Sequence, residues 1–191
     1  MQVRRTLIGA AGAVAAAITM VITLSPAAQA DTGFAPIRIA SSGSCFDVRS
    51  QDGFFSPGAR VQQWGCSGVP EQQWSFHPYA TVQMPGNPGV NIVLYQIISQ
   101  RSGLCMQADA GGVHALIRQN TCGSGSVNNL AKQLWWSRPA SAGAVTLKAW
   151  SNQTLCADVQ NGSDDDGNLL QLYDCTGNGN QQFYGDSVLT S

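Results

Sequence analysis

Six cysteines are the residues of this 191-residue chain whose chemistry can be assigned first. Their even number favours disulfide bonds over free thiols. A metal site is the weaker interpretation, because the chain has no Cys-x-x-Cys pair and only His77 and His114 to complete a ligand set. Surface or structural positions are expected for both histidines. Six cysteines allow 15 pairings, and the number alone does not choose among them.

Three segments of about 50 residues repeat the same order of motifs, and this repetition selects the pairing. Each segment has a first cysteine, a second cysteine about 20 residues later and a closing Gln-x-aromatic motif. The closing motifs are Gln72-Gln73-Trp74, Gln133-Leu134-Trp135 and Gln181-Gln182-Phe183. Equal places in the repeats pair Cys45 with Cys66, Cys105 with Cys122 and Cys156 with Cys175. A disulfide that closes a loop of this size stabilises a domain by about 3 kcal/mol in the chain-entropy model.

The elements that position these motifs are predicted to be short strands. β-prone runs precede each first cysteine, at 37–39, 96–98 and 145–147. Gly, Asn, Asp and Ser clusters separate the runs, and no stretch after the first 30 residues keeps a 3.6-residue apolar period over a helical length. The aromatic residue that closes each repeat is expected to point inward from a strand. Residues 84–89 hold two Pro and two Gly, and are expected to form an insertion loop between the first two repeats.

The first 30 residues are predicted to be a signal peptide. Two arginines precede an Ala- and Val-rich run, and Ala28-Gln29-Ala30 is a small-x-small cleavage site. A transmembrane anchor is the alternative, but Ala and Gly make much of this run only weakly hydrophobic. Residues 31–191 then form a single exported domain, with no membrane partner after cleavage.

Composition narrows the function classes further. Without the first 30 residues the chain has eight basic and eleven acidic side chains, a net charge of −3. Eight scattered cations do not build a basic face for nucleic acid. A hydrophobic content of 43% is too high for a disordered chain.

The repeated motifs resemble the ricin-type β-trefoil lectin family over roughly residues 37–184. One Gln-x-Trp motif is uninformative, whereas three such motifs in register with three cysteine pairs are specific. The resemblance implies an all-β fold, a twelve-strand β-trefoil with repeats at about 37–83, 95–139 and 144–185. It also implies a shallow sugar pocket in up to three repeats and no cofactor. Galactose-type sugars or xylan-like plant polysaccharides are the implied ligands.

A pyranose needs a carboxylate or amide for its hydroxyl groups and a flat aromatic ring for its apolar face. By resemblance, the third repeat supplies Asp158 as the carboxylate, Gln171 as a flanking amide and Tyr173 as the aromatic platform. Asn180 and Gln181 match the family's amide pair. Gln181 has an alternative structural role, because the Gln-x-aromatic motif also serves the fold.

The first repeat matches this pattern with one departure. Asp47, Gln62, Trp64 and Gln72 occupy the corresponding positions. Glu71 stands where the family usually has Asn; an ionised carboxylate cannot donate a hydrogen bond and would repel Asp47. The affinity or sugar preference of this pocket is therefore expected to differ.

The second repeat is predicted to be inactive, kept to complete the fold. Four substitutions remove its carboxylate, flanking amide, aromatic platform and Asn: Gln107, Arg118, Asn120 and Lys132. Asp109 lies two residues after Gln107 and is the one acid that could compensate.

The predicted function is that of a secreted, non-catalytic carbohydrate-binding protein, with the oligomeric state left open. A small glycosidase is the first alternative and needs two carboxylates about 5–9.5 Å apart. Glu71 with Asp47 is the only such pair that the repeats place together. The other alternative is a secreted inhibitor or toxin-like trefoil that binds protein. Such a protein would have no use for the polar and aromatic set of the third repeat.

Overall fold

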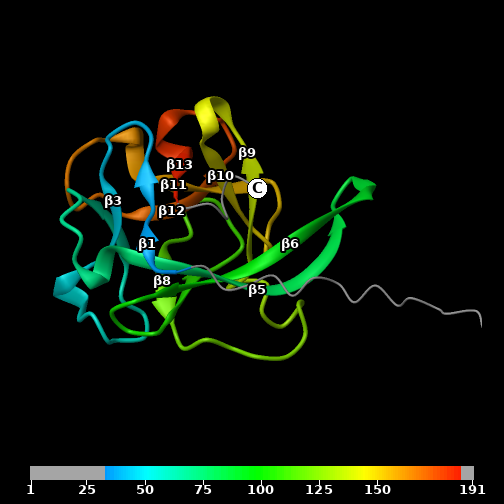
Figure 1. The fold of residues 1–191 in the computed structure, drawn as a ribbon, viewed down its shortest axis with the longest axis horizontal. Helices are drawn as coiled ribbons and strands as arrows, with labels where there is room; N and C mark the ends of the chain where they lie inside the picture. The colour runs from blue at the N-terminus through cyan, green and yellow to red at the C-terminus, as the bar shows by residue number, and fades with distance from the viewer. Residues whose placement is uncertain (1–32, 186–191) are drawn as a thin grey trace, which may run out of the picture.

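The computed structural model describes residues 33–185, so the predicted signal peptide at 1–30 lies outside the described residues. Thirteen strands and five 3-10 helices make up the regular structure of this part (Figure 1). None of its helices is long and apolar enough to cross a membrane. The strands are β1 (Ala35–Pro36), β2 (Arg38–Ile39), β3 (Cys45–Val48), β4 (Val61–Trp64), β5 (Gln73–Met84), β6 (Asn87–Ser99), β7 (Cys105–Ala108), β8 (Ile117–Asn120), β9 (Trp135–Pro139), β10 (Val145–Ala149), β11 (Leu155–Val159), β12 (Leu170–Asp174) and β13 (Phe183–Tyr184). The 3-10 helices are η1 (Ser50–Asp52), η2 (Pro70–Gln72), η3 (Ser141–Gly143), η4 (Gln160–Gly162) and η5 (Gly179–Gln181).

Six strands close into a barrel when β1 and β2 are counted as one strand. The pairing order is β1-β5-β6-β9-β10-β13-β2, and only Ile37 separates β1 from β2. β1 and β2 therefore act as one interrupted strand, which pairs with β5 on one side and with β13 on the other. With this strand counted once, the twelve strands of the expected trefoil are present.

Three hairpins, one per repeat, complete the fold: β3–β4, β7–β8 and β11–β12. Isolated bridges join each hairpin to the other two, at Arg60–Arg118, Gln62–Leu169 and Leu116–Gln171. The three repeats thus meet around one axis, and the loop of one repeat lies against the strand of the next.

The closing aromatic residues form the centre of the core, as predicted. Trp74, Trp135 and Phe183 are completely buried. The indole N–H groups of Trp74 and Trp135 donate to the backbone carbonyls of Phe46 and Met106, at 3.1 and 3.0 Å. Phe183 has no such donor and instead meets the ring of Phe46 edge-on, with centroids 4.9 Å apart. Phenylalanine therefore brings no polar side-chain atom into the core of the third repeat.

The disulfides are the three predicted pairs. Cys45–Cys66, Cys105–Cys122 and Cys156–Cys175 each join the first strand of a hairpin to the residues that follow its second strand, with Cα atoms 5.0 to 5.1 Å apart. No cysteine of the described part is free.

The prediction of an insertion loop at residues 84–89 is wrong. They form the tip of a long β5–β6 hairpin that projects beyond the rest of the fold (Figure 1). Only residues 85–86 lie outside the strands, and Gly86 adopts the positive φ of 76° that the turn requires. Pro88 lies where the register shifts, in a stretch without cross-strand Cα partners, so the missing amide donor of proline does no harm. Leu94 of this hairpin packs with Leu130, Leu134 and Trp136 in a second apolar cluster.

Candidate functional site

The β11–β12 hairpin brings the predicted residues of the third repeat together. Asp158 and Gln171 are Cα partners across the hairpin, and Tyr173 lies two residues after Gln171, on the same face of its strand. Asn180 and Gln181 come from η5, which follows β12. A hollow of about 300 Å³ opens beside them. The hollow is lined by His114, Asp158, Asn161, Gly162, Gln171, Tyr173, Thr176, Asn178 and Asn180.

Asp158 is held by three side-chain amides. Its side chain is buried, and Oδ1 accepts from Gln171 Nε2 at 2.9 Å. Oδ2 accepts from Asn180 Nδ2 at 2.7 Å and from Gln181 Nε2 at 2.9 Å. A carboxylate can accept about four hydrogen bonds, so one position remains for a hydroxyl from the hollow. The fixed amides also prevent the carboxylate from rotating away.

Gln181 lies behind Asp158 and does not line the hollow. Its side chain is completely buried, and its Oε1 accepts from the backbone N–H groups of Thr176 and Gly177 and from the Thr176 hydroxyl. Its Nε2 also donates to the Asp174 carbonyl at 2.8 Å. All its polar atoms are therefore used within the protein. The geometry gives it the structural role that was the alternative, that of positioning Asp158.

His114 is a residue of this hollow that sequence reasoning missed. It belongs to the β7–β8 loop of the second repeat, and its Nδ1 lies 3.0 Å from Gln171 Oε1. Its ring centroid is 5.2 Å from that of Tyr173, with the planes tilted by 56°. A positive φ of 66° and a backbone hydrogen bond from its N–H to the Leu172 carbonyl hold the residue in this place. The place of His114 in the hollow depends on the contact between the second and third repeats, which the sequence of one repeat does not reveal.

The hollow therefore combines the groups that a polyhydroxylated ring requires. Asp158 and the Asn180 amide oxygen can accept hydroxyl protons, and Tyr173 offers an aromatic surface. Asp158 is the single carboxylate among the lining residues. Across residues 33–185, no three His, Cys, Asp or Glu gather in a way that could hold a metal ion.

The first repeat builds the same arrangement on β3 and β4. Gln62 Nε2 donates to Asp47 Oδ1 at 2.9 Å, and Gln72 Nε2 donates to Oδ2 at 3.2 Å. Trp64 is 42% exposed and lines a hollow of about 290 Å³ beside Asp47. Gln72 is buried like Gln181, and its Oε1 accepts from Ser67. All four predicted residues of this repeat lie together, with Phe54 as a further lining residue.

Two acidic neighbours distinguish this first hollow. Glu71 lines it. Asp166, from the β11–β12 loop of the third repeat, lies outside the lining and accepts through Oδ1 from the Gly65 N–H at 2.7 Å. Burial raises the pKa of Asp47, and the charges of Glu71 and Asp166 raise it further, against the hydrogen bonds from Gln62 and Gln72. The predicted repulsion between Glu71 and Asp47 is therefore present.

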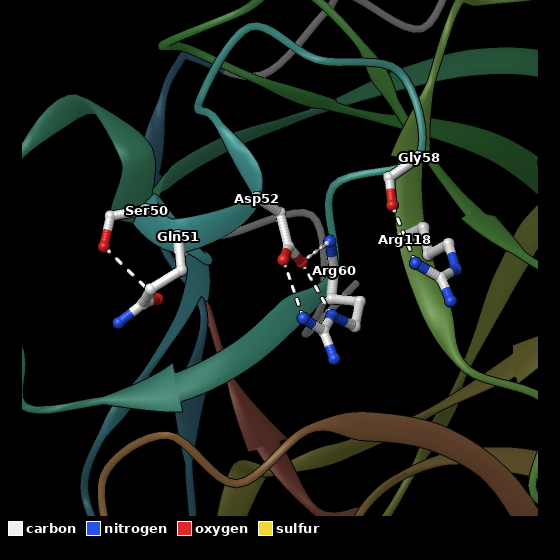
Figure 2. A network of polar contacts seen from close by, with 6 residues as sticks. All are labelled: Ser50, Gln51, Asp52, Gly58, Arg60 and Arg118. Carbon is white, nitrogen blue, oxygen red and sulfur yellow. Dashed lines mark hydrogen bonds and ion pairs between the residues drawn. The ribbon is translucent and has the colours of Figure 1, made fainter.

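The β3–β4 loop is fixed by an ion pair. Figure 2 shows the two carboxylate oxygens of Asp52 directed at the guanidinium of Arg60, with both N···O distances at 2.7 Å. Asp52 also accepts from the backbone N–H of Arg60 at 3.0 Å. Phe54, which lines the first hollow, lies within the loop that this pair closes. The same figure shows Arg118 donating to the Gly58 carbonyl at 2.8 Å, which attaches the loop to the second repeat.

The second repeat lacks both the carboxylate and the platform. Gln107 Oε1 accepts from Gln133 Nε2 at 2.8 Å, a contact between two neutral amides. Asp109 does not replace the missing carboxylate, because its Oδ2 accepts from Arg118 Nε at 2.6 Å. Lys132 Nζ donates to the Asp109 carbonyl at 3.1 Å. These side chains link loops of the fold to one another.

Comparison with known proteins gives one family and a consistent set of folds. The model of the ricin-type β-trefoil lectin domain-like family matches residues 70–173. ThreeFoil, a designed three-fold symmetric protein, is 24% identical with a TM-score of 0.67, over 81% of this chain and 98% of its own. The exo-β-1,3-galactanase 1,3Gal43A of Clostridium thermocellum is 21% identical with a TM-score of 0.66, over 81% of this chain but 30% of its own. The ricin B-like lectin of Macrolepiota procera, solved with lactose, is 13% identical with a TM-score of 0.59, over 81% of this chain and 94% of its own.

Proposed function

Since the chain belongs to the ricin-type β-trefoil lectin-like family, we propose that it is a secreted, non-catalytic protein that binds carbohydrate through the hollows of its third and first repeats. Galactose-type glycans and xylan-like polysaccharides are the proposed ligands. The lactose bound by the Macrolepiota lectin and the galactan-degrading activity in the name of the Clostridium enzyme support the first of these classes.

The observation that supports the proposal most strongly is the arrangement around Asp158. Three amides fix its carboxylate beside an aromatic ring, with capacity left for a hydroxyl group. A monosaccharide held by one such open hollow is expected to bind weakly, with a Kd of about 1 mM, equivalent to about −4 kcal/mol.

Export is proposed because the disulfides require an oxidising compartment, and because residues 1–30 have the pattern of a signal peptide. Mass spectrometry of the secreted protein is expected to find a chain that begins at Asp31. Retention of residues 1–30 on a membrane fraction would favour an anchor instead.

The binding proposal is tested by titrating the chain with galactose, lactose and xylotriose in a calorimeter. Tyr173→Ala removes the surface that covers the apolar face of the sugar, and Asp158→Ala leaves sugar hydroxyl groups unpaired, a loss of about 1–3 kcal/mol. Each change is expected to abolish detectable monosaccharide binding by the third repeat. Gln107→Ala, at the matched position of the second repeat, is the control and should change nothing.

Folding must be separated from binding in this experiment. Asp158→Ala removes the shared acceptor of three amides, of which Gln171 and Gln181 are buried, so this variant is expected to be less stable as well. Tyr173 is only half-buried, and its removal should affect binding far more than the midpoint of unfolding. Equal losses from Gln107→Ala and Tyr173→Ala would contradict the assignment of the hollows.

Absence of catalysis is tested on the same glycans. Asp158 has no second carboxylate beside it in the third hollow, whereas glycoside hydrolysis ordinarily uses two. The expected result is no release of reducing sugar over a long incubation. Sustained release that disappears in Asp47→Asn or Glu71→Gln would instead assign a glycosidase to the first repeat.

A further inference from the structure

A further hollow lies next to the hollow of the third repeat. It has a volume of about 340 Å³, and Thr176 lines both hollows. The cations that line it are Arg138 of β9 and Lys148 of β10. The remaining lining residues are Pro139, Ala140, Ser141, Thr146, Cys156, Cys175, Thr176, Gly177 and Gln182. No acidic side chain is among them.

The sheet register places one of these cations in line with the aromatic platform. Tyr173 is the Cα partner of Cys156, and Cys156 is the Cα partner of Lys148. Side chains of cross-strand partners leave the same face of a sheet, and adjacent strands are about 4.8 Å apart. Lys148 therefore lies two strand spacings from Tyr173, on the other side of the Cys156–Cys175 disulfide.

Arg138 joins Lys148 through the β9–β10 pairing. Arg138 is the Cα partner of Thr146, and Thr146 lies two residues before Lys148. All three side chains line the same hollow. Arg138 is exposed and Lys148 half-buried, and neither forms an ion pair with an acidic side chain of residues 33–185. Burial lowers the pKa of Lys148, and the neighbouring charge of Arg138 lowers it further. Two positive charges are thus brought together where an anion would relieve their repulsion.

The first repeat places a cation at the corresponding position. Trp64 pairs with Cys45, and Cys45 pairs with Arg38, so platform, half-cystine and cation follow in the same order. In the second repeat, where the platform is Asn120, the residue in the place of the cation is Ile98. The two repeats with an aromatic platform have the cation, and the repeat without a platform lacks it.

We propose that the hollow of the third repeat continues across the Cys156–Cys175 disulfide into an anion-binding subsite. In this subsite Arg138 and Lys148 bind the negative group of an acidic sugar, which is attached to the sugar that lies on Tyr173. A carboxylate or a sulfate ester supplies this chemistry, and the planar guanidinium of Arg138 suits the two oxygens of either group. Arg38 gives the first repeat a smaller version of the subsite. The proposal rests on the carbohydrate-binding function proposed above, and it extends the ligand from neutral to acidic glycans.

The test compares neutral and acidic members of matched glycan pairs. Lactose is compared with sialyllactose and with sulfated lactose, and xylotriose with glucuronosyl-xylotriose, by calorimetry of the full chain at low salt. The acidic member is expected to bind about two- to five-fold more tightly, the size of a partly exposed ion pair. This advantage should shrink as salt is raised towards 1 M, because exposed charges are then screened. Preference for the sulfated probe over the carboxylates, or the reverse, identifies the anion.

Variants locate the effect. Lys148→Gln and Arg138→Gln should each reduce the acidic advantage without changing the affinity for the neutral member, and Lys148→Arg should retain it. Lys132→Gln is the matched control, because Lys132 donates to the Asp109 carbonyl in the second repeat and does not line this hollow. Acidic probes that bind no more tightly than neutral ones, or an advantage that survives Arg38→Gln, Arg138→Gln and Lys148→Gln together, would overturn the subsite.

Failure of the proposed function gives a different pattern. In that case neither neutral probe binds, and Tyr173→Ala changes nothing. The subsite is then tested on its own by NMR titration with free glucuronate. The backbone amides of Thr146 and Lys148 should shift in the wild type and not in the Lys148→Gln, Arg138→Gln double variant. Equal shifts in both proteins would show that the cations do not bind the acid.

Discussion

Asp47 and Asp158 occupy equal positions in their repeats, but the residue next to each carboxylate differs in charge. Asn180 donates to Asp158 at 2.7 Å. Glu71 stands at the matching position beside Asp47 and, when ionised, has no proton to donate. Burial is the main cause of the raised pKa of Asp47, and the charge of Glu71 adds to it. Only the contribution of Glu71 follows from the sequence once the repeats are aligned.

Glycan binding by the first repeat should therefore depend on pH in the acidic range. The ionised form of Asp47 is the stronger acceptor for sugar hydroxyl groups, and its pKa lies above the ordinary value of 3.8. Affinity is expected to be full above this raised pKa and to fall as the pH drops through it. Calorimetric titrations with a fixed glycan over a pH series, in a Tyr173→Ala background that silences the third repeat, measure the midpoint.

Glu71→Gln is the matched variant for this midpoint. It removes one of the charges that raise the pKa of Asp47, so the midpoint should move to lower pH. The folded state also holds the Asp47 proton more tightly than the unfolded state, so ionisation of Asp47 lowers stability as the pH rises. Glu71→Gln should reduce that loss. An unchanged midpoint in Glu71→Gln would contradict the contribution of Glu71, and an affinity that stays constant over the acidic pH series would show that Asp47 does not control binding here.

At the scale of elements, site residues on the strands of a hairpin were predictable, and those on the loop of another repeat were not. Sequence motifs identified Asp158, Gln171 and Tyr173, because these residues lie on the two strands of one hairpin with fixed spacing. His114 and Asp166 were missed because each comes from the hairpin loop of another repeat. No periodicity within a repeat reveals such a contact, which depends on how neighbouring hairpins pack.

The β3–β4 loop makes a testable contribution to stability through Asp52 and Arg60. The hydrogen bonds from the Arg60 guanidinium lower the pKa of Asp52 from 3.8 to about 2. Because the folded pKa is the lower one, the stabilisation is present above about pH 4 and is lost as the pH falls through about 2. Asp52→Asn should lower the free energy of unfolding by at most about 1 kcal/mol at pH 7, since the pair is partly exposed.

Urea denaturation of the wild type and Asp52→Asn at several pH values measures this contribution. The difference between the two proteins should disappear near pH 2. Asp164→Asn, an exposed acid of the third repeat, is the control and should show no such convergence. A difference that stays constant down to pH 2 would mean that the charge of Asp52 is not the stabilising feature.

At the scale of the whole molecule, the repeats made the fold predictable and the β5–β6 hairpin did not follow from them. Three copies of the closing aromatic motif determine a three-fold core, and Trp74, Trp135 and Phe183 occupy it as expected. The hairpin occurs once, so no repeated signal identifies it. Its tip contains Pro and Gly residues that ordinarily indicate a loop, and the strand pairing of its arms depends on contacts across the chain.

The three-fold fold with two complete hollows predicts avidity for polymers. Each hollow alone is open and weak, but both are attached to one rigid core, so a polysaccharide that spans them binds the second at a high effective concentration. This linkage is expected to add about 10²–10⁴ in affinity over a monosaccharide. Asp47→Ala should therefore lower polymer affinity steeply while leaving monosaccharide binding by the third repeat intact, and Gln107→Ala should affect neither. Titration of the single variants and of the Asp47→Ala, Asp158→Ala double variant, with short and long fragments of one glycan, separates the two effects. If the Asp47→Ala variant binds the long fragment as tightly as the wild type does, the first hollow takes no part in binding and the protein is functionally monovalent.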